Sequence, residues 1–268
     1  MLPLVSTFAR RRAASALIIG SMIPDLAYFM PWFRAGHSSH SMAGLLTYCL
    51  PLGMAAVMLF EWVLREPLAF LLPAAMRSRL APPAAVTVRT LPVTMVAMAC
   101  AVIIGSFLHV QWDALANRRG IVLNGVSWAR TELARIGGYR ITASRLIDHA
   151  GTLAGGAAIT WTVARWMRSR PRRRVDETAR DERFRRMSRM ALVAIVAAGA
   201  VYGGARLRPR DEWLQVIRFS LYSIVIWTGR AAGVAAVAYA GVWWASARYR
   251  RAPVPSRVVS SEIRRSAT

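Results

Sequence analysis

The chain has 268 residues, of which 55% are hydrophobic and only 18% are charged, whereas a soluble domain usually carries about 25% charged residues. Its formal net charge is +23, and the charges gather in short arginine-rich segments between long apolar stretches. This pattern excludes an ordinary soluble domain and predicts an all-α, polytopic transmembrane helical bundle.

Most of the apolar stretches have about the 20 residues that a helix needs to cross the hydrocarbon core. We expect about six spans, in chain order Ala13–Phe33, Met42–Leu64, Leu91–Asp113, His149–Met167, Met190–Leu207 and Ile217–Ala247. The first follows three arginines, as a signal peptide would, but Pro24 and Asp25 interrupt it, so we interpret it as a retained span. The last is too long for one perpendicular span and contains Arg230. We expect one tilted helix there, with a short hairpin as the alternative.

The distribution of arginines predicts the orientation, because cytoplasmic connections are enriched in basic residues. The four segments expected inside carry a net charge of +17 in total: 1–12, 65–90, 168–189 and 248–268. The three expected outside carry +6: 34–41, 114–148 and 206–216. We therefore predict a multi-pass protein of the inner (plasma) membrane with both termini in the cytoplasm. Residues 1–251 are expected to form one transmembrane domain and residues 252–268 a disordered cytoplasmic tail.

The high basicity does not indicate a nucleic-acid partner. The run Arg172-Arg173-Arg174 lies in a short connection between spans, where positive charge is the expected topological signal and meets anionic lipid headgroups. No nucleic-acid motif accompanies it. Cys49 and Cys100 both fall inside predicted spans without metal-ligand spacing, so they are interpreted as small buried residues. The expected partner is the lipid bilayer, and the sequence does not define an oligomeric state.

Ionisable residues within apolar helices are the informative feature, because charge in a bilayer is costly and an intramembrane carboxylate indicates a functional site. Asp25 follows Pro24, past the middle of the first predicted span. His109 and Asp113 are four residues apart and therefore share one helix face. That pair could supply an imidazole and a carboxylate to one metal ion, or the aspartate could orient the histidine.

The alternation of spans places all four histidines and three carboxylates on one side of the membrane, the outer side in the predicted orientation. These residues are Asp25, His37, His40, His109, Asp113, Asp148 and His149. Each also has a structural interpretation. His37 and His40 suit a wet loop, Asp148 suits a helix N-cap, and His149 suits a helix start at the interface. The pair of His109 and Asp113 could simply bind helices together.

Three sequence blocks resemble a known family. They are Ser15–Phe29, which contains Gly-Ser-Met-Ile-Pro-Asp, then His40–Thr47 followed by Leu-Pro-Leu-Gly, and Gly105–Ala114, which contains His-Val-Gln-Trp-Asp. Together they resemble the bacterial membrane family catalogued as domain of unknown function 4184, over at least residues 13–120. That family in turn is similar to membrane-bound metal-dependent hydrolases, which share a Pro-Asp, a Thr-His-Ser-like step and a His-x-x-x-Asp.

The resemblance implies that Asp25, His40, His109 and Asp113 are metal ligands. The chain departs from the pattern in two ways. Members of the family usually have an early Ser-His-Pro, whereas residues 3–8 here contain no histidine. His37 also stands where the hydrolases have a small residue. Either a ligand has been lost, or the chain should begin earlier, or the site is not catalytic here.

Three functional hypotheses follow. The leading one is a metal-dependent hydrolase, in which His40, His109 and a carboxylate from Asp113 or Asp25 hold a divalent ion such as zinc. The ion would activate water, and the remaining carboxylate would act as general base. A site at the outer membrane boundary suggests a lipid or envelope-linked substrate. The alternatives are a non-catalytic membrane scaffold, and a transport protein in which Asp25 lines a polar pathway.

Overall fold

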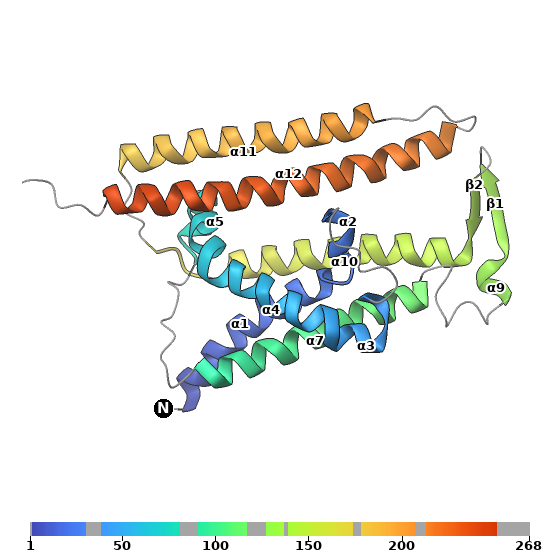
Figure 1. Cartoon of the computed structure of the whole chain (residues 1–268), viewed down its shortest axis with the longest axis horizontal. Coiled ribbons are helices and arrows are strands. Elements are labelled where there is room, and N and C mark those ends of the chain that lie inside the picture. The colour runs from blue at the N-terminus through green and yellow to red at the C-terminus, as the bar shows by residue number, and fades with distance from the viewer. Residues whose placement is uncertain are drawn as a thin grey trace, which may run out of the picture.

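The computed structural model describes residues 2–30, 39–80, 91–116, 127–136, 139–173, 178–206 and 213–250. Long helices dominate these residues and run roughly parallel to one another along the longest axis of the molecule (Figure 1). The predicted all-α class is confirmed for the bulk of the chain. His37 and the predicted tail 252–268 lie outside the described residues.

The N-terminal helix α1 (Leu2–Met22) ends earlier than the first predicted span. Pro24 has no backbone N–H to donate and disfavours a helical conformation for the residue before it. The chain therefore turns at residues 23–25 and forms only one further turn of helix, α2 (Leu26–Phe29). The expected single span over Ala13–Phe33 is accordingly wrong.

The second apolar stretch is a continuous helical run of 30 residues, Met42–Leu71. It contains two segments of wider π-helical turns. Its parts are α3 (Met42–Gly44), η2 (Leu45–Cys49), α4 (Leu50–Met58), η3 (Leu59–Leu64) and α5 (Arg65–Leu71). Pro51 explains the first π-helical segment, because it has no backbone N–H to donate to the preceding turn. In this segment the backbone N–H of Leu50 donates to the carbonyl of Leu45, five residues earlier. A short helix, α6 (Ala74–Arg77), follows.

Helix α7 (Leu91–Ala116) packs against α1 and the 42–71 run to form a three-helix unit. Gly20 and Gly105 allow α1 and α7 to approach closely, since a Cβ at Gly20 would lie 2.5 Å from the carbonyl oxygen of Val102. The Ser106 hydroxyl also donates to the carbonyl of Gly20 at 2.8 Å. Two buried clusters fill this unit: Ala16, Val57, Met98, Ala101 and Val102, and Ile23, Leu45, Cys49 and Val110.

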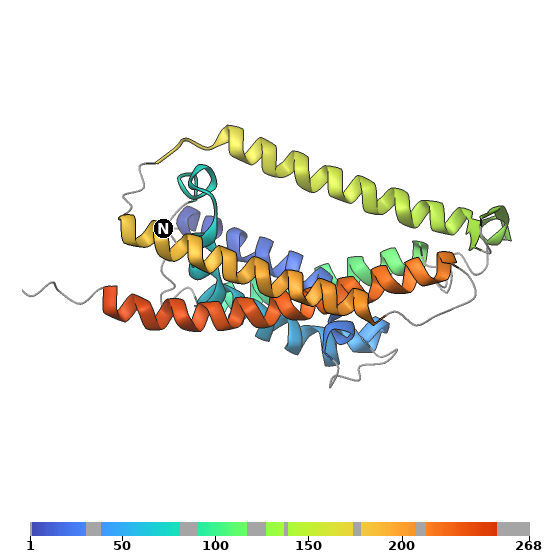
Figure 2. The same ribbon diagram turned by 90° about the horizontal axis from the view of Figure 1, so that it is seen from above.

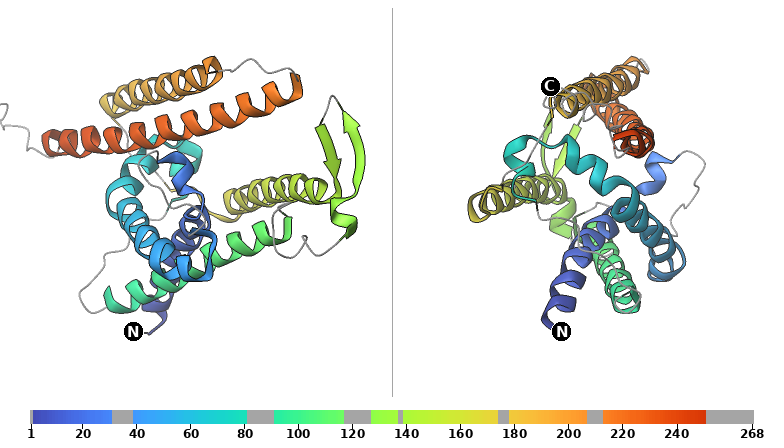
Figure 3. Two further views of the ribbon diagram at one scale, coloured as in Figure 1. Left: turned by 45° about the vertical axis from the view of Figure 1, so that its right-hand side comes forward. Right: turned by 90° about the vertical axis from the view of Figure 1, so that its left-hand side faces the viewer.

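A small antiparallel hairpin interrupts the helical pattern. It follows α9 (Ser127–Arg130) and pairs β1 (Glu132–Ile136) with β2 (Tyr139–Thr142) at the end of the molecule (Figure 3). Helix α10 (Ala143–Ser169) then returns along one flank and stands apart from the other helices when seen from above (Figure 2). Most of its side chains are exposed.

Helices α11 (Ala179–Ala205) and α12 (Trp213–Arg250) pack side by side as a long pair (Figure 1). The pair contacts the three-helix unit through α2, η3 and α5. One contact is a hydrogen bond of 3.0 Å from the indole of Trp244 to the carbonyl of Val63. The last predicted span is therefore a single helix, and the hairpin alternative is wrong.

Four helices of the described residues are long and apolar enough to cross a membrane: Met42–Leu71, Leu91–Leu115, Ala179–Ala205 and Phe219–Ser246. The expected count of about six is not supported. In place of the first predicted span, the structure has only the short apolar helix Arg12–Met22. The fourth predicted span forms as helix α10. It is rich in glycine, threonine and alanine and is not among the four candidate spans. A bilayer environment suits all four candidates, since large apolar side chains such as Ile104, Val193 and Val234 remain exposed on their faces.

Candidate metal centre

Three separate segments bring Asp25, His40, His109 and Asp113 together. Asp25 lies in the turn between α1 and α2, His40 precedes α3, and the other two lie on α7. One donor atom from each residue lies within 4.8 Å of the others. The four residues that the resemblance implied as ligands are thus neighbours in the structure, although Asp25 and Asp113 are 88 positions apart in the sequence.

Local structure directs each of these side chains into the group. Asp25 occupies the N-cap position of α2 without capping it through its side chain, so the carboxylate is available to the histidines. His109 and Asp113 share a face of α7, as their spacing predicted. His40 is fixed by the residues beside it, because Ser41 caps α3 by accepting from the backbone N–H of Gly44 at 3.0 Å.

The imidazole Nε2 atoms alternate with carboxylate oxygens around a common centre. Nε2 of His40 lies 3.4 Å from Oδ1 of Asp25 and 3.4 Å from Oδ2 of Asp113. Nε2 of His109 lies 3.6 Å from Oδ2 of Asp25 and 3.7 Å from Oδ2 of Asp113. The two rings meet edge to face, with centroids 5.7 Å apart.

These distances fit ligands around a cation better than they fit direct hydrogen bonds. A charge-assisted N–H···O bond is about 2.7–2.9 Å long. Tetrahedral zinc with bonds of about 2.0–2.2 Å places neighbouring ligand atoms about 3.3–3.6 Å apart. Nε2 of His109 is buried and finds no hydrogen-bond partner among the described residues. This group of two imidazoles and two carboxylates could therefore hold a metal ion.

The surroundings of the two histidines orient their rings. The hydroxyl of Ser39 lies 3.0 Å from Nδ1 of His40, and Ser39 itself is 1% exposed. The backbone of Ser21 in α1 also interacts with His109. Partners of this kind on the non-ligating nitrogen fix the tautomer in metal sites. The sequence analysis did not identify Ser39 as a partner of His40, although Ser39 directly precedes His40 in the sequence.

The group is open on one side, since the side chains of Asp25 and Asp113 are 42% and 37% exposed. Asp148 acts electrostatically on Asp113 from α10, near the place where Gly151 packs against the ring of Trp112. Asp148 and His149 are both exposed and stay outside the group of four. The structure therefore brings four of these residues together, and Asp148 and His149 lie outside that group.

Arg230, for which the sequence offered no partner, holds α2 in place. Its Nε donates to the carbonyl of Phe29 and one terminal nitrogen donates to the carbonyl of Tyr28, each at 3.1 Å. The guanidinium also lies over the ring of Trp227 at 4.7 Å. The contact links α12 to the helix that follows Asp25, so it positions one wall of the site.

A family model described as Domain of unknown function (DUF4184) matches residues 1–241 of the chain. The match extends the resemblance seen in the three sequence blocks to most of the length, and all four residues of the group fall within it. No curated protein and no solved structure matches the chain.

Proposed function

We propose that this chain, which belongs to the family described as domain of unknown function 4184, is a metal-dependent hydrolase of the membrane surface. The observation that carries the proposal is the convergence of four donor atoms, within 4.8 Å of one another, from three distant segments. When bound there, a divalent cation would polarise the bond to be cleaved and acidify water.

We assign His40, His109 and Asp113 as the residues that hold the cation. His109 and Asp113 are fixed relative to each other by one turn of α7, and Nε2 of His40 lies 3.4 Å from the Asp113 carboxylate. Two imidazoles and one carboxylate make a common three-residue set for catalytic zinc, which leaves a coordination position for substrate or water.

Asp25 is assigned as the general base. It is the most exposed member of the group, and its carboxylate faces both histidines from the turn after α1. A carboxylate so placed takes a proton from the attacking water and returns it to the leaving group. Cleavage by water then consumes one water molecule and leaves Asp25 ionised again.

The location suggests the substrate class. The group lies near the end of the apolar helix Leu91–Leu115, beside the exposed apolar side chains of Leu108 and Trp112. A substrate that reaches this place must suit the boundary between lipid and water, so a lipid or an envelope-linked molecule is proposed. In the predicted orientation, the site faces the outer side of the membrane.

The alternative is a scaffold in which the same ion pairs only bind helices together. The contacts of His40 and His109 with Asp25 do cross-link α7, the turn after α1 and the segment before α3. His109→Asn keeps a polar group at this place. A scaffold should retain its thermal stability and bind no metal in either form, whereas a metal centre should lose its metal in this variant.

The test of the proposed roles compares Asp25→Asn with Asp113→Asn. Purified, metal-loaded protein is assayed in micelles with a chromogenic ester and a chromogenic phosphodiester. We expect Asp25→Asn to keep its metal and lose at least about a hundredfold in turnover, the lower range for general base catalysis. Asp113→Asn should lose both. A metal-loaded wild type that turns over neither probe, or an active Asp25→Asn variant, would contradict the assignment.

A further inference from the structure

Helix α12 carries two polar side chains, Tyr222 and Arg230, beside the short helix that follows Asp25. It lies between α11 and α2 (Figure 1), and it packs so closely on α2 that a Cβ at Gly229 would overlap the ring of Phe29. Since α2 begins directly after Asp25, this part of α12 forms a wall of the proposed metal centre. The roles assigned to the four residues of that centre make no use of it.

Arg230 is a cation inside a candidate span, and it forms no ion pair with a carboxylate among the residues that the structure describes. Its guanidinium donates to the carbonyls of Tyr28 and Phe29 and lies over the ring of Trp227. These contacts hold the guanidinium in place but do not neutralise its charge. Charged residues within a span are costly and mark the paths of substrates or ions.

The guanidinium of Arg230 also has a donor left over. Nε and one terminal nitrogen donate to the two carbonyls of α2, whereas Nη1 makes no hydrogen bond to the described residues and is not buried. That nitrogen is therefore accessible to a ligand. Because the contacts with α2 and Trp227 already orient the guanidinium, little conformational entropy is lost when a ligand binds to it.

Tyr222 connects Arg230 with the metal centre. Its side chain is 53% exposed, and its ring meets the ring of Tyr28 edge to face, with centroids 6.4 Å apart. Tyr222 interacts electrostatically with both the Asp25 carboxylate and the Arg230 guanidinium. Its hydroxyl makes no hydrogen bond to the residues that the structure describes. The carboxylate, the hydroxyl and the guanidinium therefore lie around one place, on the exposed side of the centre.

The chemistry of this place suits an anion that carries an apolar tail. A divalent cation would offset the two carboxylates of the metal centre, so the charge of Arg230 remains for a negatively charged group. The planar guanidinium matches the oxygens of a phosphate, and a tyrosine hydroxyl can donate a further hydrogen bond. Beside Tyr222 on α12, the apolar side chains of Leu221 and Val225 are exposed, which suits a lipid tail.

We propose that Arg230 and Tyr222 bind a phosphate group next to the metal centre, so that the substrate of the site is a lipid with a phosphate headgroup. The inference rests on the proposed hydrolase function, because it names what that site binds. Asp25 remains the general base, and α12 supplies the contacts that hold the headgroup.

The test measures binding of hexylphosphonate to the full, metal-loaded chain in detergent micelles by calorimetry. The carbon–phosphorus bond of this probe resists hydrolysis, so binding is measured whether or not the protein cleaves esters. We expect saturable binding to the wild type, and inorganic phosphate should bind at least about tenfold more weakly, because it lacks the apolar chain. Absence of hexylphosphonate binding would overturn the proposal, and equal affinity for the two probes would contradict a lipid ligand.

Two variants remove the proposed contacts. Arg230→Gln should weaken hexylphosphonate binding at least about tenfold, because it removes a charge-assisted donor. Tyr222→Phe should weaken it about threefold, as expected for one neutral hydrogen bond. Because Tyr222→Phe keeps the ring against Tyr28, the fold is preserved in this variant. Wild-type affinity in either variant would overturn the proposal.

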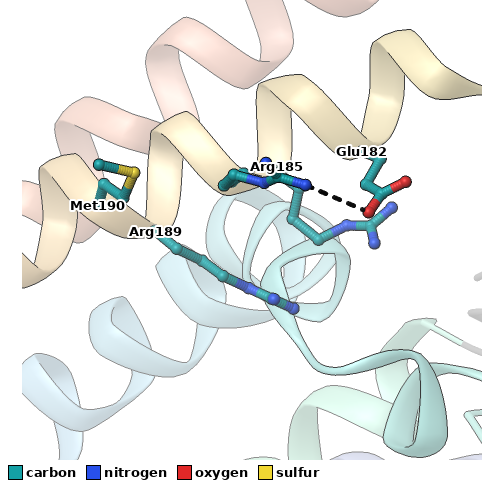
Figure 4. A pocket seen from close by; sticks show the side chains of 5 residues that line it. Glu182, Arg185, Arg189 and Met190 are labelled. Atoms are coloured by element: carbon teal, nitrogen blue, oxygen red, sulfur yellow. Dashed lines mark ion pairs between the residues drawn. The ribbon is translucent and has the colours of Figure 1, made fainter.

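Each variant has a matched control on α11. Tyr202→Phe makes the same change on the other side of α12 from α2, where the tyrosine ring packs on Trp227 (Figure 1). Arg186→Gln removes an exposed arginine from a hollow in which that side chain pairs with Glu182 (Figure 4). Both controls should change the affinity less than twofold. A loss in Arg186→Gln equal to that in Arg230→Gln would place the probe in the hollow and overturn the proposal.

Binding and turnover together separate this inference from the hydrolase assignment. A wild type that binds hexylphosphonate but cleaves neither chromogenic probe would contradict the hydrolase and support the phosphate site. A wild type that cleaves the chromogenic ester but does not bind hexylphosphonate would contradict the phosphate site alone.

Discussion

Ser39 provides a test of the proposed ligand role of His40. With a cation on Nε2 of His40, the proton of the ring lies on Nδ1, which then donates to the Ser39 hydroxyl 3.0 Å away. Ser39→Ala should therefore weaken metal binding about tenfold, the lower range for such outer partners. Competition with a fluorescent chelator measures the affinity.

Ser21→Ala is the matched control for this variant, because the Ser21 hydroxyl donates only to the carbonyl of Ile18 on the same helix. Its affinity should equal that of the wild type. A Ser39→Ala protein with wild-type affinity would contradict the orienting role.

Glu132 provides a pH-dependent prediction far from the site. Arg135 and Arg140 both bond to its carboxylate on the hairpin, and these pairs lower its pKa from 4.5 to about 2. Because the pKa is lower in the folded chain, the pairs stabilise the hairpin fully above about pH 4.5. This contribution is lost as the pH falls through 2. The protection factors of the hairpin amides against hydrogen exchange should fall in that window.

The control for this prediction is Arg135→Gln combined with Arg140→Gln. The carboxyl resonance of Glu132 should then titrate closer to pH 4.5 in an NMR experiment. A wild-type Glu132 that already titrates near 4.5 would show that the pairs do not persist in water.

At the scale of helices, the close approach of α1 and α7 sets the geometry of the metal centre. A Cβ on Gly105 would lie against the carbonyl oxygen of Leu17 and 2.8 Å from the backbone nitrogen of Ser21. Gly105→Ala should force the helices apart and cost about 1–3 kcal/mol, as overpacking does. Because α7 carries His109 and Asp113, a shift of α7 should also lower the metal affinity.

Gly155→Ala is the control at this scale, since a Cβ on that glycine of α10 meets nothing within 4 Å. Thermal unfolding in detergent and metal content should both remain at the wild-type values. Equal behaviour of the two alanine variants would show that the α1–α7 contact does not control the site.

The elements differ in how far the sequence alone predicts them. Helix formation in the apolar stretches and the shared face of His109 and Asp113 follow from local periodicity, and both are confirmed. The early end of α1 was not predicted, because the apolar composition of the first stretch outweighed the helix-breaking signal of Pro24. The partner of Arg230 was not predictable, since it consists of the backbone carbonyls of Tyr28 and Phe29, which carry no side-chain signal.

For the whole molecule, the two polar ends make a topological prediction. The hairpin lies at one end, and the arginines of α11 lie at the other (Figure 1). With the excess of arginine inside, a cysteine at Arg135 should react with a membrane-impermeant maleimide in intact cells. A cysteine at Arg183 should react only after the membrane is permeabilised.

This labelling is done in a background in which Cys49 and Cys100 are replaced by alanine. It also tests the path of α10, which connects the two ends although its sequence is too polar to count among the four candidate spans. Labelling of both positions in intact cells, or of Arg183→Cys alone, would contradict the predicted orientation.

At this same scale, the expected alternation of spans predicts only that Asp25, His40 and His109 share one side of the membrane. Which residues meet there was not predictable from alternation, since His149 satisfied the same rule and is exposed on α10. The packing of α7 against α1 and the segment before α3 brings together the four residues proposed for the metal site.

The most direct test of the central claim is the metal content of detergent-purified protein, determined by elemental mass spectrometry for the wild type, His109→Ala and His149→Ala. We predict about one zinc or similar divalent ion per chain in the wild type and in His149→Ala, and none in His109→Ala. Absence of metal from the wild type after reconstitution, or a full complement in His109→Ala, would contradict the metal centre and leave the four side chains as a bond between helices.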